Sequence, residues 1–490
     1  MHSETIRPLI PVVIVLITSI LILVSRKREN VREFWSVAGS ILTFFSVASM
    51  VPSVMNGHTL VYTLSTIAPG INLNFRVDAL SLIFGIISSL LWIFATFYNI
   101  GYMRSLNEHA QTRYYTCFAI AILGAQGVSF SGSLFSLYLF YEIITIFTYP
   151  LVAHHQDEEA YAGGKKYIIY LMGTSKGFLL PAVILTYVFT GNLDFADGIR
   201  DGVFIRGGDN IWIVVTYILF IGGFAKAAIM PLHNWLPSAM VAPTPVSALL
   251  HAVAVVKAGV FCISRVMLST FGIEMLHRLN LGIYTAYFVS FTILTASIIA
   301  LTKDDLKARL AYSTVSQLSY IVLGVALLDP AGVLGGVIHI VNHGFSKITL
   351  FFCAGAIYVA THKKKISDME GIGYAMPFTM GAFAIASLSM IGAPPVAGFI
   401  SKWYLLNGAL GIHNTTIVVI LMISTILNAG YFAPITFKAF FQGATGGWSK
   451  DKIKEAPLTM VVPIVVASLI SVVIGIFPQF FVGLIGRLLP

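Results

Sequence analysis

Charged residues are scarce in this sequence of 490 residues, since only 10% of the positions are Asp, Glu, Lys or Arg. A soluble domain needs a surface on which about a quarter of all residues are charged. Hydrophobic residues, by contrast, make up 57% of the chain. The composition therefore excludes a soluble globular protein and indicates an integral membrane protein.

Cysteine is equally rare, with three residues, Cys117, Cys262 and Cys353, each inside an apolar run. Without a CxxC pair or a His/Cys cluster, neither a disulfide framework nor a zinc or iron–sulfur site is indicated. We expect the three thiols to pack as small buried hydrophobic groups. No cofactor motif and no nucleophile–base–acid set is present, so we expect no cofactor, no metal and no enzyme chemistry.

Apolar runs of about twenty residues recur from end to end, and each is long enough to cross a bilayer core of roughly 30 Å. They predict an all-α integral membrane protein with about fourteen transmembrane helices. The loops around 57–76 and 191–210 contain Gly, Asp and Asn, which are typical of turns. The predicted spans are 5–24, 34–56, 77–101, 113–131, 134–154, 166–190, 211–231, 244–268, 281–302, 310–328, 333–361, 377–407, 415–441 and 458–485.

The distribution of basic residues predicts the orientation. If the N-terminus is outside, the loops after odd-numbered helices contain eighteen of the thirty Lys and Arg residues, and the opposite loops contain seven. Cytoplasmic loops of membrane proteins carry such an excess. We therefore expect a multi-pass protein of the cell membrane with both termini extracytoplasmic. The same excess accounts for the net charge of +9 without a nucleic acid partner.

Five lysines and one acid lie near the centres of predicted spans: Glu142, Lys176, Lys226, Lys257, Lys347 and Lys402. Each costs at least ~2.5 kcal/mol near the middle of a helix on insertion scales. A single lysine of this kind could snorkel to the headgroups, but six on separate helices are typical of a proton or cation path. Glu142 is the only acid among them, so we expect it to partner Lys226.

Internal similarity points to a repeat. A shift of 171 residues superposes Ser175 and Lys176 on Ser346 and Lys347. The shift pairs helices 4–8 with helices 9–13, and five spans per repeat imply opposite topologies. The predicted organisation is three N-terminal helices (1–112), two inverted five-helix repeats (113–268 and 281–441) and a C-terminal helix (458–490).

Two helices contain proline in corresponding places, helix 7 at Pro231 and Pro237 and helix 12 at Pro394 and Pro395. Proline frees backbone carbonyls that only protein or water can satisfy at membrane depth. Each break could be a simple kink, but a lysine lies near both. We therefore predict broken helices that line a hydrated cavity.

Polar side chains also form stripes on two helices, and a third helix carries a histidine and a lysine. Helix 11 carries His339, His343 and Lys347 at four-residue spacing, which places them along about 12 Å of one face. The two histidines lack an acid or third ligand nearby, which argues against metal binding. Helix 10 carries a stripe of Ser313, Ser316, Gln317 and Tyr320 that either joins helices or holds water. Helix 8 contributes His251 and Lys257, which lie about 120° apart around a regular helix and so do not share a face.

Residues 222–251, 342–347 and 394–402 resemble the signature of the antiporter-like subunits of respiratory complex I, membrane-bound hydrogenases and Mrp-type cation/proton antiporters. The resemblance covers roughly residues 75–441. It implies fourteen helices with two inverted repeats, each holding half of a proton path. By the same resemblance, Glu142 pairs with Lys226, Lys257 is the central lysine and Lys402 the terminal one, and Lys347 matches a lysine found in many members.

Lysine rather than glutamate at position 402, and a chain that continues no further than helix 14, make the D subunit of an Mrp antiporter the nearest match. The resemblance implies partners in the form of other membrane subunits, with H⁺ and possibly Na⁺ as the transported ions. The alternative is a proton-pumping membrane subunit of a hydrogenase or of complex I. Lys176 has no role in the family pattern.

Overall fold

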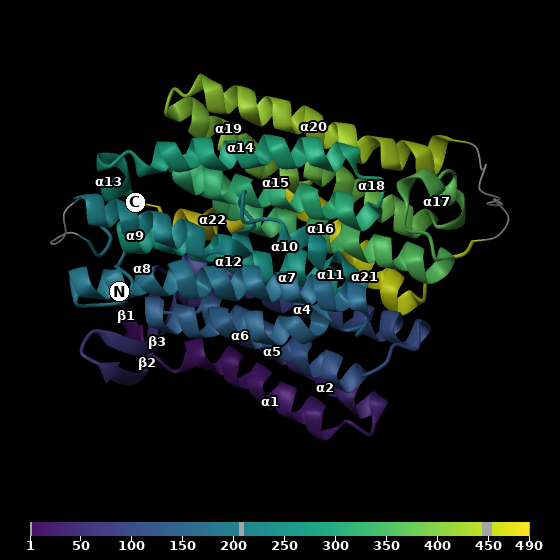
Figure 1. Cartoon of the computed structure of the whole chain (residues 1–490), viewed down its shortest axis with the longest axis horizontal. Coiled ribbons are helices and arrows are strands. Elements are labelled where there is room, and N and C mark those ends of the chain that lie inside the picture. Colours follow the sequence, from purple (N-terminus) through teal and green to yellow (C-terminus); the bar gives the residue numbers. More distant parts are fainter. Residues whose placement is uncertain (1, 205–209, 443–452, 490) are drawn as a thin grey trace.

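Helices make up most of the computed structural model, which describes residues 2–204, 210–442 and 453–489. Most of them run side by side along the long axis of the molecule (Figure 1). In chain order they are α1 (Ile10–Val24), α2 (Glu29–Ala48), α3 (Val51–Met55), α4 (Ala79–Ser105), α5 (Gln111–Ser129), α6 (Leu134–Val152), α7 (Glu158–Thr174), α8 (Leu180–Thr190), α9 (Asn210–Gly223), α10 (Trp235–Ser238), α11 (Thr244–Ala248), α12 (Val255–Arg265), α13 (Ile273–Arg278), α14 (Leu281–Thr302), α15 (Leu306–Ala326), α16 (Pro330–Thr361), α17 (Ile372–Ala375), α18 (Pro377–Ile391), α19 (Ala397–Gly411), α20 (Thr415–Phe441), α21 (Leu458–Ile476) and α22 (Gln479–Gly486).

The described residues contain ten helices that are long and apolar enough to cross a membrane. Helices α9 and α18 are apolar but shorter, because the predicted breaks end them. Helices α5 and α15 match the predicted spans 113–131 and 310–328, but their mean hydropathy is lower than that of the ten helices. In α15, polar residues such as Ser313 and Gln317 lower the mean hydropathy. The total of fourteen spans stays a prediction.

The expectation of an all-α chain is wrong in one region, because strands β1 (His2–Glu4), β2 (Thr59–Ala68) and β3 (Ile71–Val77) form a three-stranded sheet. β1 pairs in parallel with β2, and β2 pairs antiparallel with β3. The strict alternation of apolar and polar residues in β3 is the period of a strand, but turn-forming residues made this segment resemble a loop. Gly70 closes the hairpin with φ +74°.

The core lies around α16, whose described side chains are almost all buried. This helix packs against α4, α15, α18, α19 and α21, so both halves of the chain contact it. In a membrane such a helix needs no polar outer face, and it can therefore carry functional polar residues deep in the protein.

Both predicted helix breaks are present. The chain leaves regular α-helix after Gly223 and makes a 3-10 turn at Ala225–Ala227, and α18 ends at Ile391 before α19 begins at Ala397. Three π-helical turns, Ser175–Leu179, Leu249–Val253 and Val266–Phe271, were not predicted. Such turns occur frequently at functional sites.

The N- and C-terminal ends lie at the same end of the molecule as the sheet and α13, whereas α17 lies at the opposite end (Figure 1). Termini at one end fit an even number of membrane crossings. Three basic residues used to predict the orientation, Arg206, Lys450 and Lys452, lie outside the described residues, as does most of the predicted cytoplasmic loop 443–456.

Candidate functional site: a polar chain across the helix bundle

Glu142 lies on α6, buried against the start of the π-helical turn Ser175–Leu179. The Ser175 hydroxyl donates a hydrogen bond to Glu142 Oε1, and Lys176 Nζ lies 3.6 Å from Glu142 Oε2. Lys176 also donates to the Tyr138 hydroxyl at 2.6 Å. Lys176, to which the sequence assigned no role, is therefore the ion-pair partner of the buried acid.

Lys226 lies in the break of helix 7 and is fully buried. Its ammonium donates to the main-chain oxygen of Tyr141 at 2.6 Å and to Thr145 Oγ1 at 2.7 Å, and it lies 3.1 Å from the centre of the Tyr141 ring. Among the described residues Lys226 forms no ion pair, although its partners flank Glu142 on α6. The pairing of Glu142 with Lys226 stays a prediction, and it requires the carboxylate to turn away from Lys176.

The break that holds Lys226 is closed by neighbouring groups. Trp235 Nε1 donates at 2.9 Å to the carbonyl of Ala225, which also accepts from the Ala228 main-chain nitrogen at 2.9 Å. On the other side Gly259 packs so closely that a Cβ at this position would lie 2.2 Å from the main-chain nitrogen of Ala227. Pro231 and Pro237 lie beyond Lys226, between the 3-10 turn and the end of α10. Helix 8 thus packs directly against the break.

Lys257, on α12, connects this region to α16. Its ammonium lies 2.8 Å from His343 Nδ1 and donates to the main-chain oxygen of Ile340 at 3.0 Å. Lys257 is fully buried. The structure therefore brings together the central lysine of helix 8 and the histidine stripe of helix 11, a contact between residues 86 positions apart.

The stripe continues toward helix 12. The rings of His343 and His339 lie 5.9 Å apart, and His339 bonds through Nε2 to Gln317 Oε1 at 3.0 Å and through Nδ1 to Ser401 Oγ at 2.8 Å. Ser401 is the neighbour of Lys402. A polar chain, which we define as Lys257, His343, His339, Ser401 and Lys402, therefore crosses from α12 to α19.

Lys402 lies beside the helix 12 break that contains Pro394 and Pro395. Its ammonium donates to the main-chain oxygen of Ile391, the last residue of α18, at 2.7 Å and lies 5.3 Å from the centre of the Tyr320 ring. A cavity of about 340 Å³ lined by Lys402 and Tyr320 opens there. Lys402 thus satisfies a carbonyl that the break leaves without a helical partner. The predicted hydration of the break stays a prediction.

Two candidate residues lie off the polar chain. His251 stacks on Phe351 with ring centres 4.5 Å apart, and neither of its ring nitrogens has a hydrogen-bond partner among the described residues. Lys347 donates to the Leu310 main-chain oxygen at 2.9 Å and to the Ser313 hydroxyl. The helix 10 stripe thus contacts three basic side chains, Lys347, His339 and Lys402. These contacts are made by Ser313, Gln317 and Tyr320 in that order.

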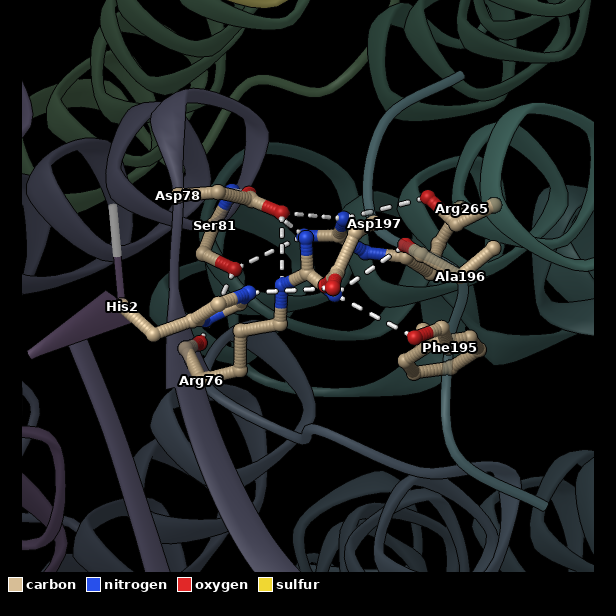
Figure 2. Close-up of polar contacts among 9 residues, drawn as sticks. His2, Arg76, Asp78, Ser81, Phe195, Ala196, Asp197 and Arg265 are labelled. Carbon is tan, nitrogen blue, oxygen red and sulfur yellow. Dashed lines mark hydrogen bonds and ion pairs between the residues drawn. The ribbon is translucent and has the colours of Figure 1, made fainter. Parts of the chain in front are cut away.

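Figure 2 shows a buried charge cluster that sequence reasoning did not predict. Asp78 caps α4 by accepting from the Ser81 nitrogen at 3.0 Å, and Arg265 contacts both carboxylate oxygens at 2.6 and 2.8 Å. Arg76 lies 3.4 Å from the same carboxylate and donates to Asp197 at 3.1 Å. The cluster joins β3, α4 and α12 at the end of the molecule that holds the termini.

Asp78 precedes the membrane-spanning part of α4, and its burial alone would raise its pKa. The guanidiniums of Arg265 and Arg76 outweigh that effect and hold the pKa of Asp78 well below its usual range. Asp78 is therefore a fixed negative charge at neutral pH. Because the cluster is built from residues far apart in sequence, only the close spacing of Arg76 and Asp78 could have hinted at it.

Comparison with known proteins identifies the family. Residues 131–428 match the model of the transmembrane family "NADH:quinone oxidoreductase/Mrp antiporter". The chain belongs to this family. The resemblance inferred from residues 222–251, 342–347 and 394–402 is thereby confirmed.

The relatives of this NADH:quinone oxidoreductase/Mrp antiporter chain are named subunits. It is 30% identical over 494 residues to NADH-quinone oxidoreductase subunit N of Desulforudis audaxviator, with 96% of each chain covered. It is 32% identical over 443 residues to the A-type Na(+)/H(+) antiporter subunit of Alkalihalophilus pseudofirmus, where the match covers 84% of this chain and 53% of that protein. It thus spans about half the length of the second relative.

The fold agrees with a solved structure of the Mrp complex from Dietzia sp. DQ12-45-1b, at a TM-score of 0.87 and 21% identity, with 99% of this chain and 96% of that chain covered. This chain is therefore a multi-pass antiporter-like membrane subunit of the kind found in Mrp-type and complex I-type assemblies. The expectation that its relatives function in multi-subunit membrane complexes is confirmed.

Proposed function

We propose that this chain translocates protons across the cell membrane as one subunit of a multi-subunit complex, and that it exchanges them for a monovalent cation such as Na⁺. The observation that carries the proposal is the polar chain from Lys257 to Lys402. Buried lysines and histidines in direct contact at membrane depth are expensive, and such groups mark ion pathways.

Each residue of the polar chain has a chemical task in this proposal. Histidine can accept a proton on one ring nitrogen and donate from the other, so His343 and His339 pass a proton between Lys257 and Ser401. Ser401 is adjacent to Lys402, which exchanges the proton with water in the helix 12 break. Lys347 acts from the side by changing the electrostatic field at His343.

Glu142 starts the other half of the path. The carboxylate holds Lys176 in the described structure, and Lys226 lies one step away behind Tyr141 and Thr145. We propose that Glu142 exchanges Lys176 for Lys226, which alternately favours the charged and neutral forms of each lysine. His251 assists Lys257 through water or through a neighbouring helix.

The repeat organisation predicted from sequence completes the proposal: residues 113–268 and 281–441 form two inverted repeats, with residues 1–112 and 458–490 outside them. The two breaks in helices 7 and 12 support it, since inverted-repeat transporters carry broken helices in corresponding positions. Both termini face outward in this arrangement. Thiol labelling with an impermeant reagent tests the orientation: in intact cells a single cysteine at position 200 should react and one at 450 should not.

The most specific assignment that we propose is the D subunit of an Mrp antiporter. A second candidate is a proton-pumping subunit of a redox complex, favoured by the 96% mutual coverage with a subunit N. Mass spectrometry of the purified complex separates them. Co-purifying iron–sulfur or nickel–iron subunits would establish the redox complex, and their absence together with other Mrp subunits would establish the antiporter.

Transport itself is tested with Lys257→Ala in everted membrane vesicles, by following a pH-sensitive dye after addition of Na⁺. The substitution removes the contact with His343, so cation-dependent proton movement should be abolished. The exposed Lys27→Ala serves as the control for an altered lysine away from the path. Normal transport by Lys257→Ala in an assembled complex would refute the proposed path.

A further inference from the structure

A second group of histidines and carboxylates lies outside the polar chain, where the α4–α5 connection meets the end of α6. Glu108 and His109 come from the connection and His154 and His155 follow α6. Asn107 and Ala110 adopt left-handed backbone conformations with φ +50° and +48°. These residues make the connection turn sharply and bring Glu108 and His109 next to His154.

The ligand atoms of Glu108, His109 and His154 all lie within 4.8 Å of one another. Glu108 Oε2 is 3.7 Å from His154 Nε2 and 3.8 Å from His155 Nδ1, and the rings of His109 and His154 are 4.7 Å apart. His154 is 0% exposed, and neither ring nitrogen has a hydrogen-bond partner among the described residues. A buried imidazole without such a partner is costly, which points to a ligand.

We propose that Glu108, His109 and His154 bind one divalent transition-metal ion of the Zn²⁺ class. Imidazole and carboxylate ligands suit zinc, which takes nitrogen at about 2.0–2.1 Å in a tetrahedral arrangement. That arrangement separates ligand atoms by roughly 3.3 Å, so rotation of the exposed His109 side chain closes the remaining gap. His155 or water supplies the fourth ligand.

The charges of the side chains around the site nearly cancel, so the ligand types decide which ion fits. Glu108 provides a negative charge, while Arg113 provides an opposing positive charge and donates to the His154 main-chain oxygen at 3.0 Å. A hard cation such as Mg²⁺ prefers several oxygen ligands and retains its water, and the site offers mainly nitrogen. A borderline-soft ion therefore fits better.

The site lies at the rim of a cavity of about 630 Å³ lined in part by Glu108, His155 and Asp157, and by the 237–244 connection that leads into helix 8. A bound ion would join the α4–α5 connection to the end of α6 and neutralise Glu108. This consequence rests on the proposed function: zinc should slow proton access through this cavity. Binding itself does not depend on transport.

Metal binding is measured on the intact complex, stripped with EDTA, incubated with ZnCl2, desalted and analysed by elemental mass spectrometry. About one zinc per chain should remain on the wild type. His109→Gln and Glu108→Gln each remove one ligand and should lower the affinity at least 10–100-fold, the range seen for loss of a supporting ligand contact. His277→Gln, an exposed histidine elsewhere, should retain the ion.

Two results would overturn the site: absence of retained zinc on the wild type, or unchanged retention in His109→Gln when the complex is intact. Because His109 is exposed, its replacement should not disturb folding, unlike a change at the buried His154. In vesicles, zinc should slow transport by the wild type but not by His109→Gln. Equal inhibition of both would refute the link to the cavity, and a complex without transport would refute the proposed function while leaving the binding result intact.

Discussion

Replacement of Asp78 by Asn tests the buried charge cluster of Figure 2. Asn is as good a helix N-cap as Asp, so it can still accept the bond from the Ser81 nitrogen while its negative charge is lost. Arg265, whose side chain is 1% exposed, would then lose its carboxylate partner, while Arg76, 9% exposed, would keep only Asp197. Breaking a buried pair in this way costs about 3–5 kcal/mol.

The measurement is thermal stability of the detergent-solubilised complex, followed as the fraction that remains monodisperse after heating. A loss of this size in the free energy of unfolding should lower the temperature at which half of the complex remains monodisperse, by on the order of 5–10 °C. Asp329→Asn is the matched control, because Asp329 also caps a helix, accepting from Ala331 and Gly332 at 2.9 and 3.1 Å. A shift in Asp78→Asn no larger than in this control would refute the reasoning.

A double variant separates charge from packing. Arg265→Met combined with Asp78→Asn removes both ends of the pair, so the double variant should lose about 0.5–3 kcal/mol less stability than the two single variants lose together.

The pH dependence of this stability has a defined sign. Because the folded pKa of Asp78 lies below its usual range, its contribution is fully present above about pH 4. The difference between wild type and Asp78→Asn should stay constant from pH 7 to 5 and shrink only in stronger acid.

Three further predictions concern the path. Glu142→Gln should reduce transport severely in an assembled complex, and Lys176→Ala should reduce it too. The reason is that an ion pair at 3.6 Å contributes roughly 1–5 kcal/mol to the balance between Lys176 and Lys226 as partners of Glu142. Normal dye-measured transport by both variants would contradict the exchange of partners. His251→Ala should only weaken the transport that Lys257→Ala abolishes, and the opposite order would move the relay to His251. Lys402→Arg should fail like Lys402→Ala, because arginine does not release its proton; if Lys402→Arg transports normally in vesicles, Lys402 merely anchors the helix.

Sequence predicted the helices well where apolar length alone decides them. The predicted span 281–302 has the same bounds as α14, and 415–441 the same bounds as α20. Proline and glycine also located both breaks, since the missing amide of proline is a local property of the chain. The hairpin of β2 and β3 was not predicted, because the turn-forming residues in the same segment are equally typical of a loop.

Contacts between distant residues could not be predicted from sequence. Glu142 was assigned to Lys226 as the only acid available, yet the π-helical turn at Ser175 brings Lys176 to the carboxylate. The three-ligand group around His154 escaped notice because its members lie in two separate connections, about forty-five residues apart, and neither segment has metal-binding spacing of its own.

The π-helical turn Leu249–Val253 has a consequence for insertions and deletions in this part of the gene. It accommodates one more residue than a regular α-helical turn, which is how π-turns arise within α-helices. The angle of about 120° between His251 and Lys257 expected for a regular helix therefore does not apply. Removal of one residue from this turn would restore regular winding while turning one end of helix 8 by about 100° relative to the other. Lys257 and Gly259 both follow this turn on α12, so they could keep their contacts with His343 and with the helix 7 break only if Thr244–Ala248 turned instead. The length of this turn therefore constrains the protein as strongly as the identity of the lysine does.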